Sequence, residues 1–285
     1  MTDRIKLEDG AYGRRAVIVA AWSDDMVKFL VDEQIVELEL NQGKGWHGDD
    51  LKFLAELPQL RSLVIIDFKI SSVEPIHFLH ELRVLDVMTY CKTELRFSSF
   101  PRLEDCGLEW RPRATSLFDC TTLKKLFVNR YKGKNTEPFA KLSKLESLEI
   151  LNAPIDDLRG LSALAKLRSL RLAGLRCLAS LAGIERLTNL EELEIDTCRR
   201  IPSIDEIGCL HRLRVLHLSN DGDIESLKPL SKLRRLTSVT FVESTNILDG
   251  DLSPLLEQTN LTRVAFRNRR HYSHRRDEFE PARNG

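Results

Sequence analysis

The chain lacks a long hydrophobic run. Its longest early apolar stretch covers residues 16–22, far short of the roughly 20 residues that a membrane-spanning helix needs. Charged residues stand close to the first methionine, at Asp3, Arg4 and Lys6, and no secretory segment is visible. We therefore expect no membrane association and a cytoplasmic location.

Paired cysteine motifs are also missing. The 6 cysteines show no C-x-x-C spacing and no flanking pairs, and stand at positions 91, 106, 120, 177, 198 and 209. Cys106 falls on an apolar position of the repeat described below, where a free thiol behaves as a small hydrophobe. The absence of paired cysteine spacings favours a protein that resides in the reducing cytosol. His47 with Asp49 and Asp50 is too small a set for a metal site.

Net charge and catalytic motifs are absent as well. The 43 basic and 43 acidic residues cancel, which removes a global electrostatic case for binding nucleic acid or an anionic membrane. No nucleophile elbow, H-E-x-x-H, phosphate loop or spaced Cys/His set is present. The sequence therefore predicts a protein that is not an enzyme and that needs no cofactor or metal.

What the chain does have is an internal repeat. The phrase L-x-x-L-x-x-L-x-(L/I) occurs three times between residues 142 and 195, and its third apolar position serves as the reference. Eleven reference residues follow at intervals of 20 to 25: Leu38, Leu63, Leu85, Cys106, Leu126, Leu148, Leu170, Leu193, Leu216, Val239 and Val264. Apolar side chains alternate with period 2 around each of them, which predicts a short strand in every repeat.

Between the strands the apolar residues step by three, as in Leu158, Leu161 and Leu164. This period indicates 3₁₀ turns with about 3.0 residues per turn. About 22 residues per unit leave little room for a long helix in a crossover between parallel strands. We expect a right-handed coil of parallel strands.

The core phrase Leu145-x-x-Leu148-x-Ile150 resembles the leucine-rich-repeat family, in its short variety of about 22 residues per unit. The resemblance implies an α/β repeat fold: a leucine-rich-repeat solenoid of about 11 repeats, with a curved parallel sheet on its concave face and 3₁₀ turns, short helices and loops on its convex face. It covers residues 35–268. The family usually has asparagine five residues after the reference, whereas here Asn152, Asn220 and Asn268 stand one place early. A continuous asparagine ladder is therefore not expected.

The ends and two irregular segments complete the organisation. We expect residues 1–34 to cap the stack with a strand over residues 15–21 and a short helix that Ser23 caps. Residues 35–268 form one elongated repeat domain, and residues 269–285 are a polar, disordered tail.

Residues 41–50 predict a turn with an exposed Trp46. Residues 95–120 predict a distorted repeat, whose polar run at 113–116 is either degenerate or a protruding binding loop.

Function is expected on the concave face, where residues one before, one after and three after each reference point away from the core. Apolar side chains collect there in the first half of the chain, and such clusters mark interaction surfaces. The alternative is that they only pack against one another. The predicted partner-binding residues are Val64, Ile66, Phe68, Met88, Tyr90, Trp110, Phe127, Asn129, Tyr131, Glu149, Arg171, Glu192, Glu194, Asp196 and His217.

Charge is sorted between that face and its rim. Acids outnumber bases on the concave face, while bases stand just before the strands, as at Arg61, Arg83, Lys124, Arg168 and Arg214. An acidic face favours a basic or mixed-charge protein partner. The sequence thus predicts a non-catalytic protein-interaction scaffold, such as an inhibitor or regulatory subunit. The alternative is a nucleic-acid-binding protein that uses the basic rim, although nucleic acid is the less favoured partner.

Overall fold

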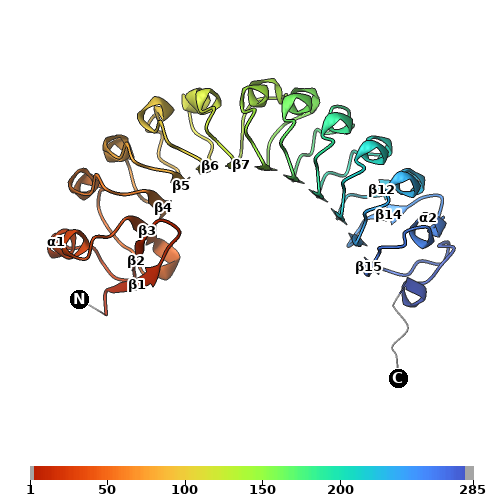
Figure 1. The fold of residues 1–285 in the computed structure, drawn as a ribbon, viewed down its shortest axis with the longest axis horizontal. Coiled ribbons are helices and arrows are strands. Elements are labelled where there is room, and N and C mark those ends of the chain that lie inside the picture. Colours follow the sequence, from red (N-terminus) through yellow and green to blue (C-terminus); the bar gives the residue numbers. More distant parts are fainter. Residues whose placement is uncertain (1–2, 280–285) are drawn as a thin grey trace. The chain divides into compact units, whose positions relative to one another are not determined.

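In a computed structural model of the chain, the structure describes residues 3–279. The chain divides into two compact units, Met1–Val128 and Asn129–Gly285, where the sequence predicted a single repeat domain. Each unit is built from strands that alternate with short turns (Figure 1). We call them unit 1 and unit 2.

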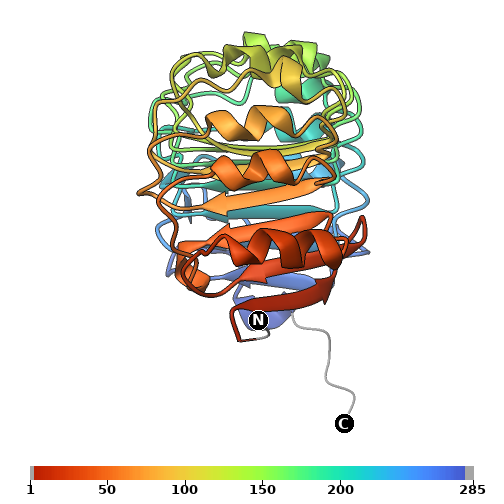
Figure 2. The same ribbon diagram turned by 90° about the vertical axis from the view of Figure 1, so that its left-hand side faces the viewer.

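Unit 1 contains the first strands of the repeat. Its strands follow one another in the sheet in chain order, and β1 pairs with β2 antiparallel while the later pairs are parallel. In Figure 2 the turns of this unit lie in front of its strands. The strands are β1 (Ile5–Asp9), β2 (Arg14–Ile18), β3 (Glu37–Asn41), β4 (Ser62–Ile66), β5 (Val84–Met88) and β6 (Asp105–Glu109), and β7 (Lys125–Asn129) follows at the division between the units.

Unit 2 repeats the same plan. Its main strands are parallel and in register, so that each reference residue lies beside the next, as Leu148 beside Leu170. These strands are β8 (Ser147–Leu151), β9 (Ser169–Ala173), β10 (Glu192–Asp196), β11 (Val215–Ser219), β13 (Ser238–Val242) and β15 (Arg263–Phe266), and β12 (Asp223–Ile224) pairs with β14 (Asn246–Ile247). All eleven predicted reference residues lie in strands, so the predicted strand register is confirmed.

The predicted 3₁₀ turns are confirmed too. Leu161 N–H donates to the carbonyl of Leu158, Leu164 to Leu161 and Leu167 to Leu164, each at 2.9–3.0 Å. The three-residue leucine step is therefore the hydrogen-bonding step of the backbone itself, and it lines these side chains up in the core. The turns are η1 (Gln42–Lys44), η2 (Lys52–Glu56), η3 (Glu74–Phe78), η4 (Phe97–Ser99), η5 (Ala114–Asp119), η6 (Glu137–Lys141), η7 (Arg159–Ala163), η8 (Ile184–Arg186), η9 (Asp205–Cys209), η10 (Lys228–Lys232) and η11 (Arg276–Phe279).

Within residues 3–279, α-helix occurs at α1 (Asp25–Asp32) and α2 (Ser253–Leu256). Helix α1 is the short helix that the sequence predicted, but Asp24 holds its N-cap position in place of Ser23. The predicted first strand corresponds to β2, while β1 was not anticipated from the sequence.

Strand exits in unit 2 share a backbone feature. The residue four places after the reference has a positive φ of 53–67° after β7 to β13, at Arg130, Asn152, Gly174, Thr197, Asn220 and Glu243. Asparagine and glycine tolerate this left-handed conformation best. Asn152 and Asn220, which stand one place early in the repeat, therefore serve the turn and not a buried ladder.

Three expectations differ from the structure. Trp46 is 0% exposed, because its indole Nε1–H donates to the buried Asp67 carboxylate at 3.0 Å and its ring lies against Trp22 and Phe53. The run predicted as a protruding loop joins turn η5, and Ala114 is buried there.

The predicted tail also differs. Residues 269–279 contact the last repeat: Tyr272 Oη accepts a hydrogen bond from Ile247 N–H at 3.1 Å, and the Phe279 ring lies 5.9 Å from that of Phe266. These contacts are at odds with disorder over 269–279. Residues 280–285 lie outside the described part of the chain.

Candidate functional site

The candidate site is the sheet face formed by strand residues one before, one after and three after each reference. In unit 1 this face carries apolar side chains. Ile66 on β4 lies directly opposite Met88 on β5, and both are partly exposed. Just beyond the strands, Phe68 and Tyr90 are 46% and 57% exposed, with ring centroids 4.6 Å apart. We call these four residues the apolar patch.

The aromatic pair is exposed because of how β4 and β5 end. Asp67 and Thr89, four places after their reference residues, are buried and have no positive φ. The strand alternation therefore continues for one more step, since Asp67 N–H still donates to the Met88 carbonyl at 3.2 Å. The next side chains, Phe68 and Tyr90, point to solvent.

Tyr131 occupies the same repeat position after β7 but behaves differently. It is 5% exposed and meets Phe139 edge to face at 5.3 Å, and burial raises the pKa of its phenol. Arg130 before it has a φ of 59°, which turns the following side chain inward. The prediction that Tyr131 projects onto the binding face is therefore wrong.

The remaining predicted apolar residues are partly exposed. Val64 lies on the sheet face of β4, opposite Asp86, and Phe127 lies on that of β7. Trp110 is half-buried, with its ring 6.0 Å from that of Phe118. Asn129 Oδ1 accepts a hydrogen bond from Asn152 Nδ2 at 2.9 Å. Ile66, Phe68, Met88 and Tyr90 are the predicted residues that the structure brings together in unit 1.

Two acids flank the apolar patch. Asp86 stands between Val84 and Met88 on β5; burial first, and then repulsion by Asp105 on the next strand, raise its pKa to about 6. Burial also raises the pKa of Asp105. Gly107 gives the Asp86 carboxylate its space, because a Cβ at that position would collide with Asp86 Oδ1. Within residues 3–279, neither carboxylate has a cation at ion-pair distance.

Glu39, on the other side of the patch, is by contrast fully compensated. It is 4% exposed, which by itself raises its pKa, but hydrogen bonds from Lys44, Asn41 and Arg15 outweigh burial and lower the pKa overall. The charge of Glu39 is therefore neutralised by cations of the same chain.

Two of the predicted acids of unit 2 share an internal cation. Arg171 on β9 lies between Glu149 and Glu194, with Nη1 3.3 Å and Nε 3.0 Å from their carboxylate oxygens. Asp196 accepts a hydrogen bond from the Thr197 hydroxyl at 2.6 Å. Glu192 is exposed, and half-buried His217 lies opposite Glu194 in the sheet register.

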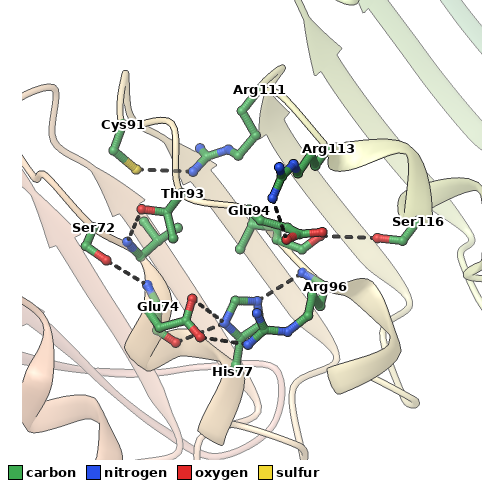
Figure 3. Close-up of polar contacts among 12 residues, drawn as sticks. Ser72, Glu74, His77, Cys91, Thr93, Glu94, Arg96, Arg111, Arg113 and Ser116 are labelled. Atoms are coloured by element: carbon green, nitrogen blue, oxygen red, sulfur yellow. Dashed lines mark hydrogen bonds and ion pairs between the residues drawn. The ribbon is translucent and has the colours of Figure 1, made fainter.

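A polar cluster supports the loops beside the patch (Figure 3). The Arg111 side chain is 3% exposed and donates to Thr89 Oγ1 at 3.1 Å, Cys91 Sγ at 3.3 Å and the Val87 carbonyl at 3.4 Å. Burial lowers the pKa of its guanidinium. Arg111 thus ties β6 to the segment that carries Tyr90. The sequence signal for it was an arginine at the position where the repeat expects a buried asparagine.

His77 plays a similar structural part in Figure 3. Its Nε2 accepts the Arg96 N–H at 3.0 Å, and Nδ1 lies 3.0 Å from the Glu74 carbonyl oxygen. Burial is the main cause that lowers its pKa. A neutral ring satisfies both contacts, so His77 holds two turns together.

Several cations of the basic rim are engaged in ion pairs. Arg83 and Lys124 both lie 2.7 Å from Glu104, and Arg168 lies 3.0 Å from Glu191. Among the described residues, no group of three or more His, Cys, Asp or Glu side chains could hold a metal ion. No helix in the same part of the chain is long and apolar enough to cross a membrane.

Fold comparison defines the class of protein: the architecture is that of the leucine-rich-repeat proteins. An internalin (inlF) of Listeria monocytogenes matches with a TM-score of 0.62 and 22% identity, covering 90% of this chain and 83% of that one. A leucine-rich-repeat protein of Leptospira interrogans matches with a TM-score of 0.64 and 17% identity over 86% and 69%. A TDR receptor matches with 0.61 and 16% over 86% and 45%.

These likenesses show the fold. No protein-family model and no curated protein sequence matches the chain. One fold serves many functions, so the task of this chain has to be argued from its own surface.

Proposed function

We propose that this chain is a non-catalytic, cytosolic scaffold that binds a partner protein through the sheet face of unit 1. The apolar patch is the anchor, and Asp86 with Asp105 receives a basic side chain of the partner. Val64 and Phe127 extend the contact. An inhibitor or regulatory subunit would use its surface in this way.

The exposed Phe68–Tyr90 pair is the observation that carries the proposal. Aromatic side chains and methionine are enriched at protein interfaces, and truncating such anchors typically costs the most binding energy. Here the two rings contact each other, tilted by 36°, and follow Ile66 and Met88 on neighbouring strands, so a partner would bury one continuous surface. Such clustered apolar surface marks an interaction site.

The flanking charges support a basic residue in the partner. An unpaired, half-buried carboxylate gains from an opposite charge, and complementary potentials choose partners and speed association. Asp86 fits this description best, because the charge of Lys125 already acts on Asp105, and Glu149 and Glu194 share Arg171. The partner surface that fits best therefore places a lysine or arginine next to an apolar side chain.

Nucleic-acid binding along the basic rim has less support. A phosphate backbone is bound by cations that release counterions, and several rim cations already face Glu104 or Glu191. Retention on an RNA column that falls steeply with salt would favour this alternative over a protein partner.

The test starts with affinity purification from the native host and identification of the captured protein. Calorimetry with that purified protein then compares wild type, the double variant Phe68→Ala/Tyr90→Ala and the control Phe78→Ala. Phe78 is a suitable control because it is 59% exposed on η3, outside the patch.

We expect the double variant to lose about 2 kcal/mol or more of binding free energy and Phe78→Ala to bind like wild type. Circular dichroism should be unchanged for both, since the rings are already exposed before binding. Equal affinities of all three proteins would contradict the proposed site.

A further inference from the structure

The terminal strand β1 leaves one edge of the unit 1 sheet open. Among the described strands, β1 pairs with β2 alone. An unpaired edge presents a row of backbone donors and acceptors that can accept another strand. Natural proteins usually cover or block such an edge, so its side chains show what it can pair with.

The hydrogen-bond pattern shows which groups face outward. Val19 N–H donates to the Arg4 carbonyl at 3.0 Å and Gly10 N–H to the Gly13 carbonyl at 2.8 Å, at the two ends of the β1–β2 ladder. Bonded and non-bonded pairs alternate in an antiparallel ladder, so Lys6 and Glu8 bond towards β2. The N–H and C=O groups of Ile5, Leu7 and Asp9 therefore point away from the sheet.

Lys6 and Glu8 of β1 form an ion pair with each other at 2.6 Å, and the same two charges are complementary between two copies of the strand. In an antiparallel pair of two β1 strands centred on Leu7, Lys6 of each copy faces Glu8 of the other, and Ile5 faces Asp9. Registers centred on Lys6 or Glu8 instead place like charges opposite each other, which destabilises a sheet pair. Leu7 is one of the exposed large hydrophobic residues, at 37%, and would meet its own counterpart on the twofold axis.

We propose that β1 pairs with β1 of a second copy of this chain to form a twofold symmetric dimer. Such an interface is isologous, because the same surface serves both subunits. The outward groups of Ile5, Leu7 and Asp9 supply its backbone hydrogen bonds, and the Lys6–Glu8 contacts fix its register. The contact is small, so the dimer forms in a concentration-dependent way. It uses none of the residues of the apolar patch.

The test is a charge exchange followed by sedimentation velocity over rising protein concentration. Wild type should shift from monomer to dimer. Lys6→Glu alone puts two acids opposite each other, Glu8→Lys alone puts two bases opposite each other, and both proteins should stay monomeric. An equimolar mixture of these two variants should dimerise, as should the double variant Lys6→Glu/Glu8→Lys. Lys166→Glu, an exposed change in unit 2, should dimerise like wild type.

Thermal melts of each variant separate misfolding from lost pairing. A monomeric wild type at every concentration would overturn the proposal, and so would single charge variants that dimerise as well as wild type. Restored dimerisation in the mixture of two monomeric variants excludes unfolding as the cause.

A second arm reports on the register. In a Cys177→Ser/Cys209→Ser background, which removes the exposed thiols, Leu7→Cys brings two thiols together on the axis. Bonded cross-strand pairs have Cα atoms about 5.5 Å apart, which suits a disulfide. Oxidation should give a covalent dimer for Leu7→Cys and not for the control Leu248→Cys, whose side chain is 53% exposed in unit 2. Equal cross-linking of both variants would contradict the register.

Discussion

The exits of the strands differ between the two units, although the leucine pattern is the same. In unit 1, Asp67 and Thr89 are buried four places after the reference, and the aromatic rings that follow them are exposed. After β7 to β11 in unit 2, the residue at that place is left-handed, and the next side chain, such as Leu175 or Cys198, is buried. A left-handed residue thus precedes a buried side chain after β7 to β11, whereas Arg111 after β6 is buried without one, through its own hydrogen bonds, and Ser244 after β13 is exposed in spite of one.

The charges of the two units differ in a parallel way. Arg171 lies between two glutamates in unit 2, so both acids share one internal cation. Asp86 and Asp105 in unit 1 form no ion pair within residues 3–279, although the charge of Lys125 lowers the pKa of Asp105 against the effect of burial. Two acids of unit 2 therefore have an internal cation, while unit 1 combines apolar area with two carboxylates that form no ion pair within the described residues.

The largest expected effect tests what the units share. Leu85→Ala in unit 1 and Leu170→Ala in unit 2 both truncate reference residues that are at most 1% exposed. Each should lower the free energy of unfolding by about 2–5 kcal/mol through lost burial and a cavity. Urea melts measure the change, with the exposed Arg176→Ala as a control that should stay within about 0.5 kcal/mol. If either leucine variant changed the free energy of unfolding by no more than Arg176→Ala does, its unit would lack this core.

The second prediction concerns buried acids and pH. Asp221 in unit 2 is 1% exposed; its Oδ1 accepts the Cys198 N–H at 2.9 Å, and burial raises its pKa from 3.8 to about 7. The folded state therefore binds the proton more tightly than the unfolded state. The stability from this group is fully present below about pH 4 and is lost as pH rises through about 7.

Asp221→Asn removes this titration. Its stability relative to wild type should increase between pH 4 and 8, by at most about 4 kcal/mol, since one pKa unit corresponds to about 1.4 kcal/mol. Urea midpoints across this range measure the difference, and exposed Asp223→Asn serves as the control. Asp86→Asn in unit 1 should show the same trend over a window that ends near pH 6. Parallel pH profiles for wild type and Asp221→Asn would contradict the prediction.

Much of the fold follows from local sequence pattern, because the spacing of the leucines within each repeat predicts its strand and its 3₁₀ turn. The candidate site was harder to predict, because exposure depends on backbone angles that an alternating pattern does not encode. Tyr90 and Tyr131 occupy the same repeat position, yet one is 57% and the other 5% exposed. Trp46 was misplaced because its partner Asp67 lies 21 residues away in sequence.

The third prediction compares charges in binding. Asp86→Asn should weaken binding of the partner protein about tenfold, or about 1.4 kcal/mol, because it removes a carboxylate that has no internal cation. Glu194→Gln should change affinity less, since Arg171 already neutralises Glu194. Calorimetry with the identified partner measures both, and wild-type binding should weaken below about pH 6 as Asp86 takes up a proton. An equal loss for the two variants would show that both units carry the site.

The smallest expected effect tests the strand exits directly. Glu243 in unit 2 has a φ of 57° and an exposed side chain. A glycine at this position avoids the steric cost of the left-handed conformation, about 1–2 kcal/mol. It also loses more backbone entropy on folding, which offsets part of that gain. Glu243→Gly should therefore raise the free energy of unfolding by less than about 1 kcal/mol.

Thr89, at the same repeat position in unit 1, has no positive φ, is 1% exposed and accepts a hydrogen bond from Arg111. Thr89→Gly should thus be destabilising by about 1 kcal/mol or more. Urea melts measure the sign of the change in the free energy of unfolding for each variant. Destabilisation by Glu243→Gly, or stabilisation by Thr89→Gly, would mean that the backbone angle does not distinguish these two strand exits.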